Sequence, residues 1–131
     1  MSLFNRIFGN SDQQTQKTDE TSDPERNFQI LKDDGVRARN MREMPFAIQC
    51  FQEALKIKDD AETLSYLAEA YLLTGQTENA LPCLEKLTAT EPDNLQLLLT
   101  AAHAALKCQQ YDKAQTWLEQ AGQAAAHDPP A

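Results

Sequence analysis

A set of apolar residues that recurs three times at almost constant spacing constrains this chain more than any other feature. An alanine is followed by a large apolar residue four positions on and by a further apolar residue three positions later, at residues 47–54, 80–87 and 114–121. A leucine with a small residue four positions after it precedes each set. The copies follow one another with a period of about 34 residues. Each copy predicts a pair of amphipathic helices that buries its apolar surface only when neighbouring pairs stack on it.

The middle copy, residues 61–94, shows both helices of one pair and the turns that bound them. Its first helix has an apolar face at three- and four-residue spacing, made by Leu64, Leu67, Ala68, Tyr71 and Leu72. Gly75 follows this run, where a left-handed cap residue belongs. Thr77 stands where a side-chain oxygen can cap the second helix. Pro92 closes the copy, because proline disfavours a helical conformation in the residue before it.

This pattern resembles the tetratricopeptide repeat (TPR), a helical hairpin of about 34 residues. The resemblance covers roughly residues 28–127, and the middle copy carries it most completely, with Leu64, Leu67, Ala68, Tyr71, Ala80, Leu84 and Pro92 at the family positions. The first copy departs from the pattern at Asp34, where an apolar residue is usual, and at Asp59, where proline is expected. The third copy has Ala126 in place of that proline. Three copies in phase favour this family over a generic helical bundle.

The resemblance implies an all-α fold, a right-handed α-α superhelix of three TPR-like helical hairpins. We predict a flexible segment at residues 1–23, with a short amphipathic tip at residues 1–8, and a three-repeat domain at residues 24–131. The repeats are expected at about 28–60, 61–94 and 95–128. The last helix of the domain leaves an outer face near Trp117, which makes Trp117 a candidate for self-association.

Composition excludes several functions. The formal charge of −8 and the pI of about 4.6 argue against nucleic-acid binding, which needs clustered Lys and Arg. Three cysteines, Cys50, Cys83 and Cys108, form no CxxC pair and no disulfide framework, so they indicate packing residues in a reducing, cytoplasmic protein.

The amphipathic tip has its apolar residues on one side of a short helix: Leu3, Phe4, Ile7 and Phe8. It is too short to span a bilayer and lacks the core and cleavage site of a secretory signal. Two functional interpretations stay open, a weak anchor in a membrane surface and a segment that docks into a groove of its own chain or of a partner. A tail without function is the third. Residues 9–23 contain no apolar residue and predict a flexible tether.

The family uses the first helix of each repeat to line a concave groove that holds a peptide or a helix, and the resemblance implies the same here. The candidate groove residues are Lys32, Arg39, Asn40, Ser65, Glu69, Leu72, Leu99, His103, Leu106 and Lys107. They are basic in the first repeat, partly acidic in the second and apolar in the third. This lining predicts an amphipathic ligand held by apolar contacts near Leu72, Leu99 and Leu106.

One subgroup of the family holds the acidic tail of heat-shock chaperones between two carboxylate-binding sets of side chains. It requires Lys and Asn in the first repeat, Asn in the second, and Lys and Arg in the third. Only Lys32 fits, since Val36, Tyr66, Gln96 and Thr100 stand at the other positions. Binding of that type is therefore disfavoured.

No sequence motif predicts catalysis, a metal site or a cofactor. His103 has no second ligand at helical spacing, and the pairs Asp33-Asp34 and Asp59-Asp60 are expected near helix ends or on turns, where solvation explains them. We therefore predict a non-enzymatic TPR adaptor or assembly factor that binds a protein or peptide partner. The alternatives are a peripheral membrane protein anchored by residues 1–8 and a homodimeric or homo-oligomeric chaperone like the small three-repeat chaperones of bacterial secretion systems.

Overall fold

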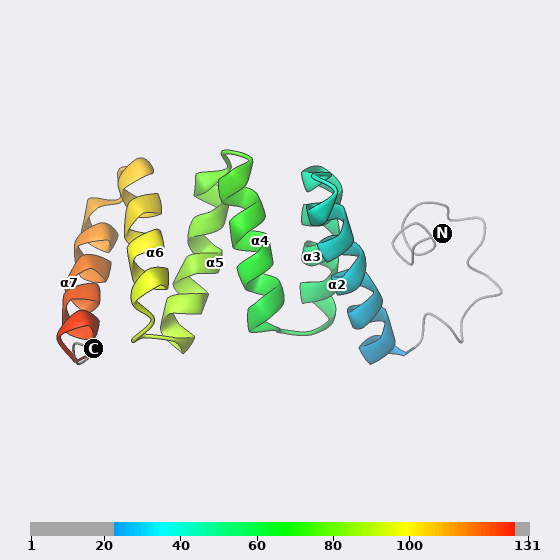
Figure 1. Ribbon diagram of the computed structural model, residues 1–131, viewed down its shortest axis with the longest axis horizontal. Coiled ribbons are helices and arrows are strands. Elements are labelled where there is room, and N and C mark those ends of the chain that lie inside the picture. The colour runs from blue at the N-terminus through cyan, green and yellow to red at the C-terminus, as the bar shows by residue number, and fades with distance from the viewer. Residues whose placement is uncertain (1–22, 128–131) are drawn as a thin grey trace. The chain divides into compact units, whose positions relative to one another are not determined.

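The computed structural model describes residues 23–127, and over this range the chain is all-helical, as predicted. Residues 1–22 and 128–131, which include the amphipathic tip and nearly all of the tether, lie outside the described residues. The helices are α2 (Pro24–Asn40), α3 (Met44–Ile57), α4 (Ala61–Leu73), α5 (Thr77–Thr90), α6 (Leu95–Lys107) and α7 (Tyr111–His127) (Figure 1). They belong to two compact units that divide between Ala70 and Tyr71, called unit 1 and unit 2 below. None of the described helices is both long and apolar enough to cross a membrane.

Side chains cap the start of α2 and of α6, whereas the cap predicted at Thr77 is wrong. The carboxylate of Asp23 accepts a hydrogen bond from the amide of Arg26 at 3.3 Å, ahead of Pro24 in the first turn of α2. The side chain of Asn94 accepts from the amide of Leu97 at 3.0 Å and starts α6 in the same way. Thr77 does not cap α5, because it is already the first helical residue, and Gln76 before it makes no side-chain cap bond.

The turn between the two helices of each hairpin repeats with the period of the sequence. Arg42, Gly75 and Gln109, each one repeat after the last, have positive φ angles of 63°, 79° and 61°. The residue after each one donates its amide to a carbonyl five positions back: Glu43 to Ala38 at 2.8 Å, Gln76 to Tyr71 at 2.7 Å and Gln110 to Ala105 at 2.8 Å. This pairing satisfies carbonyls that the end of a helix would otherwise leave without partners. The cap predicted at Gly75 is confirmed, and its equivalents use residues that tolerate this conformation less well.

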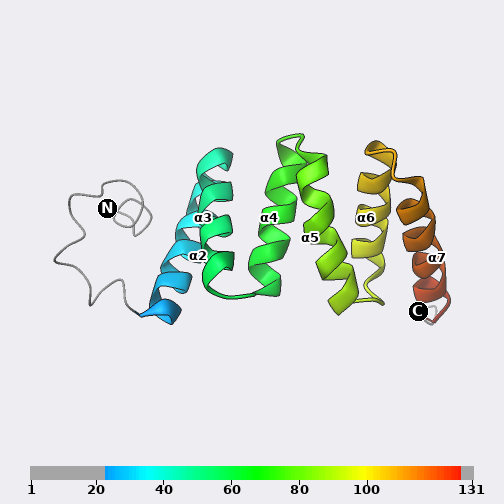
Figure 2. The same cartoon turned by 180° about the vertical axis from the view of Figure 1, so that it is seen from behind.

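In unit 1, α2 lies beside α3, as the two views of the ribbon show (Figures 1 and 2). Phe28, Leu31 and Ala54 form a buried cluster between them. Gly35 sets the spacing of the two helices, since a Cβ atom added to it would lie 2.7 Å from Cδ1 of Phe51, whose side chain is fully buried. The small residue predicted at this position is therefore required by the close approach of the helices.

In unit 2, α6 contacts both α5 and α7, and the alanines of α6 lie in these contacts. Ala101 and Ala105 are fully buried. α6 is not buried on all sides, because three of its leucines are 37–46% exposed. The large apolar residue of the third repeat also differs from its equivalents: Leu118 is 46% exposed, whereas Phe51 and Leu84 are buried. Tyr111 and Leu118 are thus exposed apolar residues of α7, whereas Trp117 is only 7% exposed.

The prediction that Asp34 lies near a helix end is wrong, because it lies in the interior of α2. Its side chain is 4% exposed, and one carboxylate oxygen accepts a bond from Arg37 while the other has no partner. Burial raises the pKa of the Cys50 thiol to about 12, and the charge of Asp34 contributes to this increase. A carboxylate at a position where the family has an apolar residue therefore lowers the stability of unit 1.

Asp60 connects the start of α4 to α2 within unit 1. Its Oδ2 accepts from the amide and the hydroxyl of Thr63, at 2.9 and 2.6 Å, and from Nζ of Lys32 at 3.0 Å. Burial opposes the ionisation of Asp60, but the bonds from Thr63 and Lys32 outweigh it and lower the pKa of the carboxyl from 3.8 to about 2. Asp60 therefore stabilises the folded state in its charged form.

The Gly35 contact predicts opposite effects for two glycine-to-alanine substitutions. Gly35→Ala should lower the free energy of unfolding by about 1–3 kcal/mol, because overpacking against Phe51 outweighs the better helix propensity of alanine. Gly122→Ala is the matched control, since no atom lies within 4 Å of its added Cβ in α7, and it should raise stability by up to about 1 kcal/mol. Urea unfolding followed by circular dichroism measures both. An unchanged midpoint for Gly35→Ala would show that the ring of Phe51 can move aside.

The Asp60 interactions predict a pH-dependent loss of stability. The folded pKa lies below the unfolded one, so the contribution is present above pH 4 and is lost as the pH falls towards 2. Asp60→Asn should lower the free energy of unfolding by about 1 kcal/mol at pH 7, a value reduced for partial exposure, and should have little effect near pH 2. Asp59→Asn, at an exposed neighbour, serves as the control. An equal loss at both pH values for Asp60→Asn would assign the effect to helix capping geometry instead of charge.

Candidate functional site

Five of the ten candidate groove residues lie in unit 1, on α2 and α4. They are Lys32, Arg39, Asn40, Ser65 and Glu69. With Glu62 and Tyr66 they form what is called here the α2–α4 surface. Most of its members are half-buried or exposed polar side chains, and several contact one another across the two helices.

Lys32 on this surface is paired with two carboxylates. Its Nζ lies 3.0 Å from Asp60 Oδ2 and 2.7 Å from Glu62 Oε1, and its side chain is 14% exposed. The bond with Glu62 raises the pKa of Lys32 against the opposing effect of burial, and Asp60 adds to the increase. The same bond lowers the pKa of Glu62. The charge of Lys32 is therefore balanced inside unit 1.

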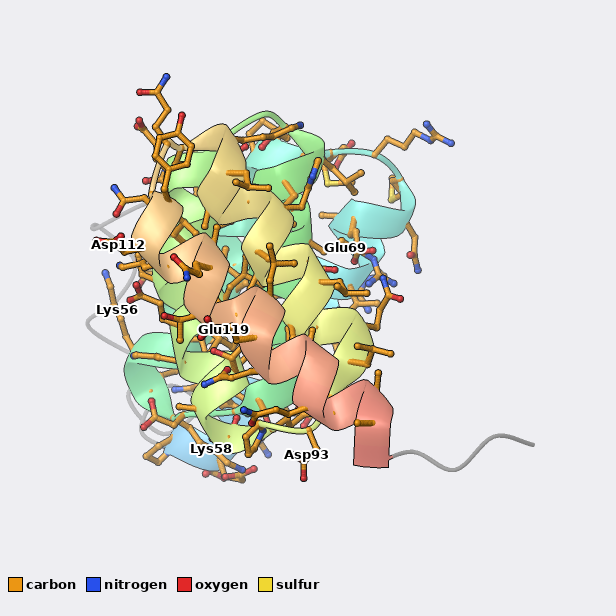
Figure 3. The ribbon with its side chains drawn as sticks, turned by 90° about the vertical axis from the view of Figure 1, so that its left-hand side faces the viewer. Lys56, Lys58, Glu69, Asp93, Asp112 and Glu119 are labelled. Carbon is orange, nitrogen blue, oxygen red and sulfur yellow. The ribbon has the colours of Figure 1, made fainter. Side chains whose placement is uncertain are left out.

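Arg39 is held by an aromatic ring and an acid. Its guanidinium lies 4.7 Å from the centre of the Tyr66 ring, and its Nη1 lies 3.4 Å from Oε1 of Glu69, which Figure 3 labels. The Tyr66 ring stacks in turn on buried Phe51, with 5.6 Å between centroids and 28° between planes. A cation over an aromatic face is attracted by the ring quadrupole. Tyr66 thus orients Arg39, a role that the helical spacing of the sequence did not identify.

A further ion pair in unit 1 involves none of the candidate residues. Nζ of Lys58, labelled in Figure 3, lies 3.1 Å from Glu25 and 5.0 Å from the centre of the Phe28 ring. It joins the residue after α3 to the first turn of α2. The basic side chains on unit 1 that face neighbouring helices are therefore engaged in holding the fold.

The other five candidate groove residues lie in unit 2: Leu72, Leu99, His103, Leu106 and Lys107. Leu99 and Leu106 are 43% and 46% exposed, and Leu95, one turn before Leu99, is 37% exposed. Residues 4 and 11 positions apart lie on the same side of a helix. Leu95, Leu99 and Leu106 therefore form one exposed apolar row along α6, called here the α6 strip. His103 and Lys107 are exposed at its edge.

Two apolar residues of unit 2 differ from the sequence prediction. Leu95 was missed as a candidate, although its spacing from Leu99 was the signal that could have identified it. Leu72 is half-buried at the end of α4, whereas Leu73 beside it is 64% exposed. The exposed apolar residues of unit 2 thus include Leu73 and Leu95, which the sequence analysis did not select.

Burial raises the pKa of the Cys50 and Cys83 thiols, which makes both poor nucleophiles. All three cysteines are free. Among residues 23–127, no three His, Cys, Asp or Glu side chains are placed to hold a metal ion. An open depression of about 620 Å³ in unit 2 has a mixed lining, made by Gly75, Gln76, Thr77, Glu78, Asn79, Lys107 and Cys108.

The fold of the chain is similar to that of two proteins of known structure. The chain is similar to PcrH, as seen in a crystal structure of PcrH in complex with the chaperone binding region of PopB. The TM-score is 0.63 and the sequence identity is 20%, and the match covers 78% of this chain and 83% of PcrH. It is also similar to MamA from Desulfovibrio magneticus RS-1, residue 41 to the end, with a TM-score of 0.65 and 22% identity over 83% of this chain. The chain spans 60% of that MamA.

The sequence itself adds a family match. No curated protein matches the chain. The family model described as tetratricopeptide repeat matches residues 72–131. The C-terminal part of the chain therefore matches the tetratricopeptide repeat, and the described residues share the helical-hairpin fold of PcrH and MamA.

Proposed function

We propose that this protein is a non-catalytic interaction module, a TPR adaptor or assembly factor that binds a short amphipathic segment of a partner protein. The observation that carries the proposal is the α6 strip. Three leucines at 37–46% exposure on one side of one helix form a continuous apolar row that the described residues leave open to solvent. A row of this kind suits the apolar face of an incoming helix or extended peptide.

The strip can supply most of the binding free energy. Burying a leucine side chain fully contributes about 1.5–3 kcal/mol, so three partly exposed leucines can contribute several kcal/mol together. Exposed His103 and Lys107 at the edge can bond to polar or acidic groups of the ligand. Leu99, Leu106, His103 and Lys107 are thus the proposed contacts in unit 2, with Leu95 added and Leu72 as a half-buried support.

The α2–α4 surface suits a different role. Lys32 and Arg39 already bond to Asp60, Glu62 and Glu69, so a ligand carboxylate would have to displace an acid of the protein itself. A strongly acidic peptide gains little there, in line with the missing carboxylate clamp of the sequence. Asn40, Ser65 and Glu69 are exposed and offer hydrogen bonds that can fix the register of a ligand without adding much affinity.

Two further observations support the proposal. The similar PcrH structure contains the chaperone binding region of PopB, so a fold of this kind can hold a segment of another protein. Burial raises the pKa of the Cys50 and Cys83 thiols, so neither thiol suits a role as a nucleophile. We place the protein in the cytoplasm, because three free cysteines fit a reducing compartment.

Substitution of Leu99 tests the proposal. Native protein and Leu99→Glu are used as bait in parallel, captured proteins are identified by mass spectrometry, and a synthetic peptide from the best candidate is titrated by calorimetry. Leu99→Glu should weaken peptide binding by at least about tenfold, because the loss of one buried leucine and the burial of a charge each reduce affinity. Circular dichroism confirms that the variant stays folded.

Gln120→Glu is the control, since it introduces the same charge at an exposed residue of α7, outside the α6 strip and the residues at its edge. It should change the affinity by less than about twofold. Equal affinity of the native protein and Leu99→Glu for the peptide would remove the α6 strip as the binding surface.

The likeness to PcrH favours one second candidate, a small chaperone that keeps a client segment soluble. The chain covers 83% of PcrH, whereas it covers only 60% of MamA. A chaperone should raise the soluble fraction of its captured partner on co-expression, and Leu99→Glu should abolish that rise. A partner that is equally soluble alone would favour the adaptor.

A further inference from the structure

The third hairpin, α6 and α7, exposes residues at positions that the first hairpin, α2 and α3, uses to contact a further helix. Leu99 and Leu106 of α6 are 43% and 46% exposed, and Leu118 of α7 is 46% exposed. The repeat period makes them equivalent to three residues of the first hairpin: Lys32, Arg39 and Phe51. The contacts of these three residues in unit 1 therefore indicate what the third hairpin can contact.

Both charged members of this set contact α4, the first helix of the next hairpin. Nζ of Lys32 lies 2.7 Å from Oε1 of Glu62, and Nη1 of Arg39 lies 3.4 Å from Oε1 of Glu69. Arg39 comes seven residues after Lys32, and Glu69 comes seven residues after Glu62. The two helices therefore run in the same direction where they meet.

The aromatic member of the set contacts the same side of α4. The ring of Phe51 stacks on the ring of Tyr66, with 5.6 Å between centroids. Phe51 also lies directly against Gly35 of α2, and the equivalent pair in the third hairpin is Leu118 and Ala102. α6 contacts α7 within unit 2, and Ala102 lies in the middle of α6. The equivalence therefore places Leu118 beside the α6 strip.

The third hairpin has different side chains at the same positions. The two acids of α4 suit the cations of α2, but the leucines that replace these cations suit apolar side chains instead. The ring of Tyr66 suits either hairpin, because an aromatic ring packs on Leu118 as it packs on Phe51. A complementary helix therefore carries a large apolar residue, an aromatic residue four positions later and a second apolar residue three positions after that.

The first helices of this chain do not have that pattern. In α4 the three positions are acidic, aromatic and acidic. The equivalent positions in the other two helices are mostly polar: Gln29, Asp33 and Val36 in α2, and Gln96, Thr100 and His103 in α6. In α2, Nε2 of Gln29 also donates to Oδ1 of Asp33 at 3.0 Å, so both side chains are already engaged. A second copy that stacked through α2 would therefore place polar groups on leucines, and a helix of another protein fits better.

We propose that the third hairpin binds its partner by helix addition. One helix of the partner lies parallel to α6, in the place that α4 takes beside α2, and contacts Leu118 of α7 as well as the α6 strip. The first apolar residue of this helix lies beside Leu99, and the second lies beside Leu106. This inference rests on the proposed function, since it takes the α6 strip as the partner-binding surface, and it adds the form and the direction of the bound segment.

A peptide of α4 supplies the probe, because α4 is the helix that fills the equivalent place in unit 1. Residues 60–74 are synthesised with a fluorescein label in two forms, the native peptide and a leucine peptide with Glu62→Leu and Glu69→Leu. Fluorescence anisotropy with the full chain should show that the leucine peptide binds at least about tenfold more tightly. The native peptide would have to bury two acids against leucines.

A protein variant with the cations of α2 should reverse this preference. Leu99→Lys combined with Leu106→Arg gives α6 the side chains of α2, so this variant should bind the native peptide at least about threefold more tightly than the leucine peptide. Thr116→Arg combined with Gln120→Lys is the matched control. It adds the same charge two residues before and after Leu118, on the opposite side of α7, and should leave the preference of the native chain unchanged.

Leu118→Glu distinguishes helix addition from binding to α6 alone. It should weaken binding of the leucine peptide at least about tenfold, because the aromatic ring would then meet a charge in place of a leucine. Leu118→Ala, which removes the apolar contact and favours the helix, should weaken binding at least about threefold. It keeps the test valid if the glutamate disturbs α7, which circular dichroism shows.

Four outcomes would overturn the inference. They are equal or absent binding of the two peptides by the native chain, an unchanged affinity for both Leu118 variants, and no gain of helix in the far-ultraviolet circular dichroism of the leucine peptide on binding. The fourth is a native dimer that Leu118→Glu dissolves in sedimentation velocity, because it places a second copy on this surface instead of a partner helix.

The partner peptide from the Leu99→Glu experiment separates this inference from the proposed function. If its binding depends on Leu99 but not on Leu118, the α6 strip binds the partner in another arrangement, and only helix addition is excluded. If its binding depends on neither residue, both proposals fail. A partner peptide that becomes helical on binding and depends on both residues supports both.

Discussion

Close packing between the two helices of a hairpin is the interaction on which the rest of the structure depends. In unit 1, α2 approaches α3 so closely that Gly35 leaves no room for a Cβ atom beside the buried ring of Phe51. In unit 2, the alanines of α6 allow the same helix to contact both α5 and α7. Small residues bring the backbones together, and large residues opposite them fill the space. This contact fixes the rotation of each first helix, and with it the side that faces away from the second helix and is available for function.

Equivalent positions of the three hairpins carry different kinds of side chain. Lys32, Ser65 and Leu99 are equivalent by the repeat period, and so are Arg39, Leu72 and Leu106. In unit 1, the positively charged members bond to nearby acids and to the ring of Tyr66, so they stabilise the fold. In unit 2, the equivalent leucines on α6 are 43% and 46% exposed. The repeat therefore sets where a surface lies, and the residue at each register position decides whether it supports the fold or is available to a partner.

The sequence predicted the elements well because helix formation, capping and turns depend on residues close along the chain. Gly75, for example, has the left-handed conformation that its position after the apolar run of α4 indicates. Predictions that depend on contacts between helices were less accurate. Asp34 is buried in the interior of α2, and on α7 Leu118 is exposed whereas the neighbouring Trp117 is buried. Periodicity identifies the apolar side of a helix, but the distance to the next helix decides which residue on that side is covered. The pairing of Lys32 with Asp60 and Glu62 was missed for the same reason, since both partners lie at the start of the next hairpin, far along the chain.

The separation of paired charges from exposed leucines has a consequence for how a partner would be chosen. An apolar contact gives affinity with little discrimination, because any helix with leucines at one-turn spacing can use it. The charge of −8 supplies the missing selection, since it attracts basic segments and repels acidic ones before contact is made. On the proposed function, unit 2 would determine how long a partner stays bound, while the field of the whole chain would determine which partners arrive. Lys32 and Arg39 lie against acids of the protein itself, so each pair is close to neutral at a distance and adds little to that field.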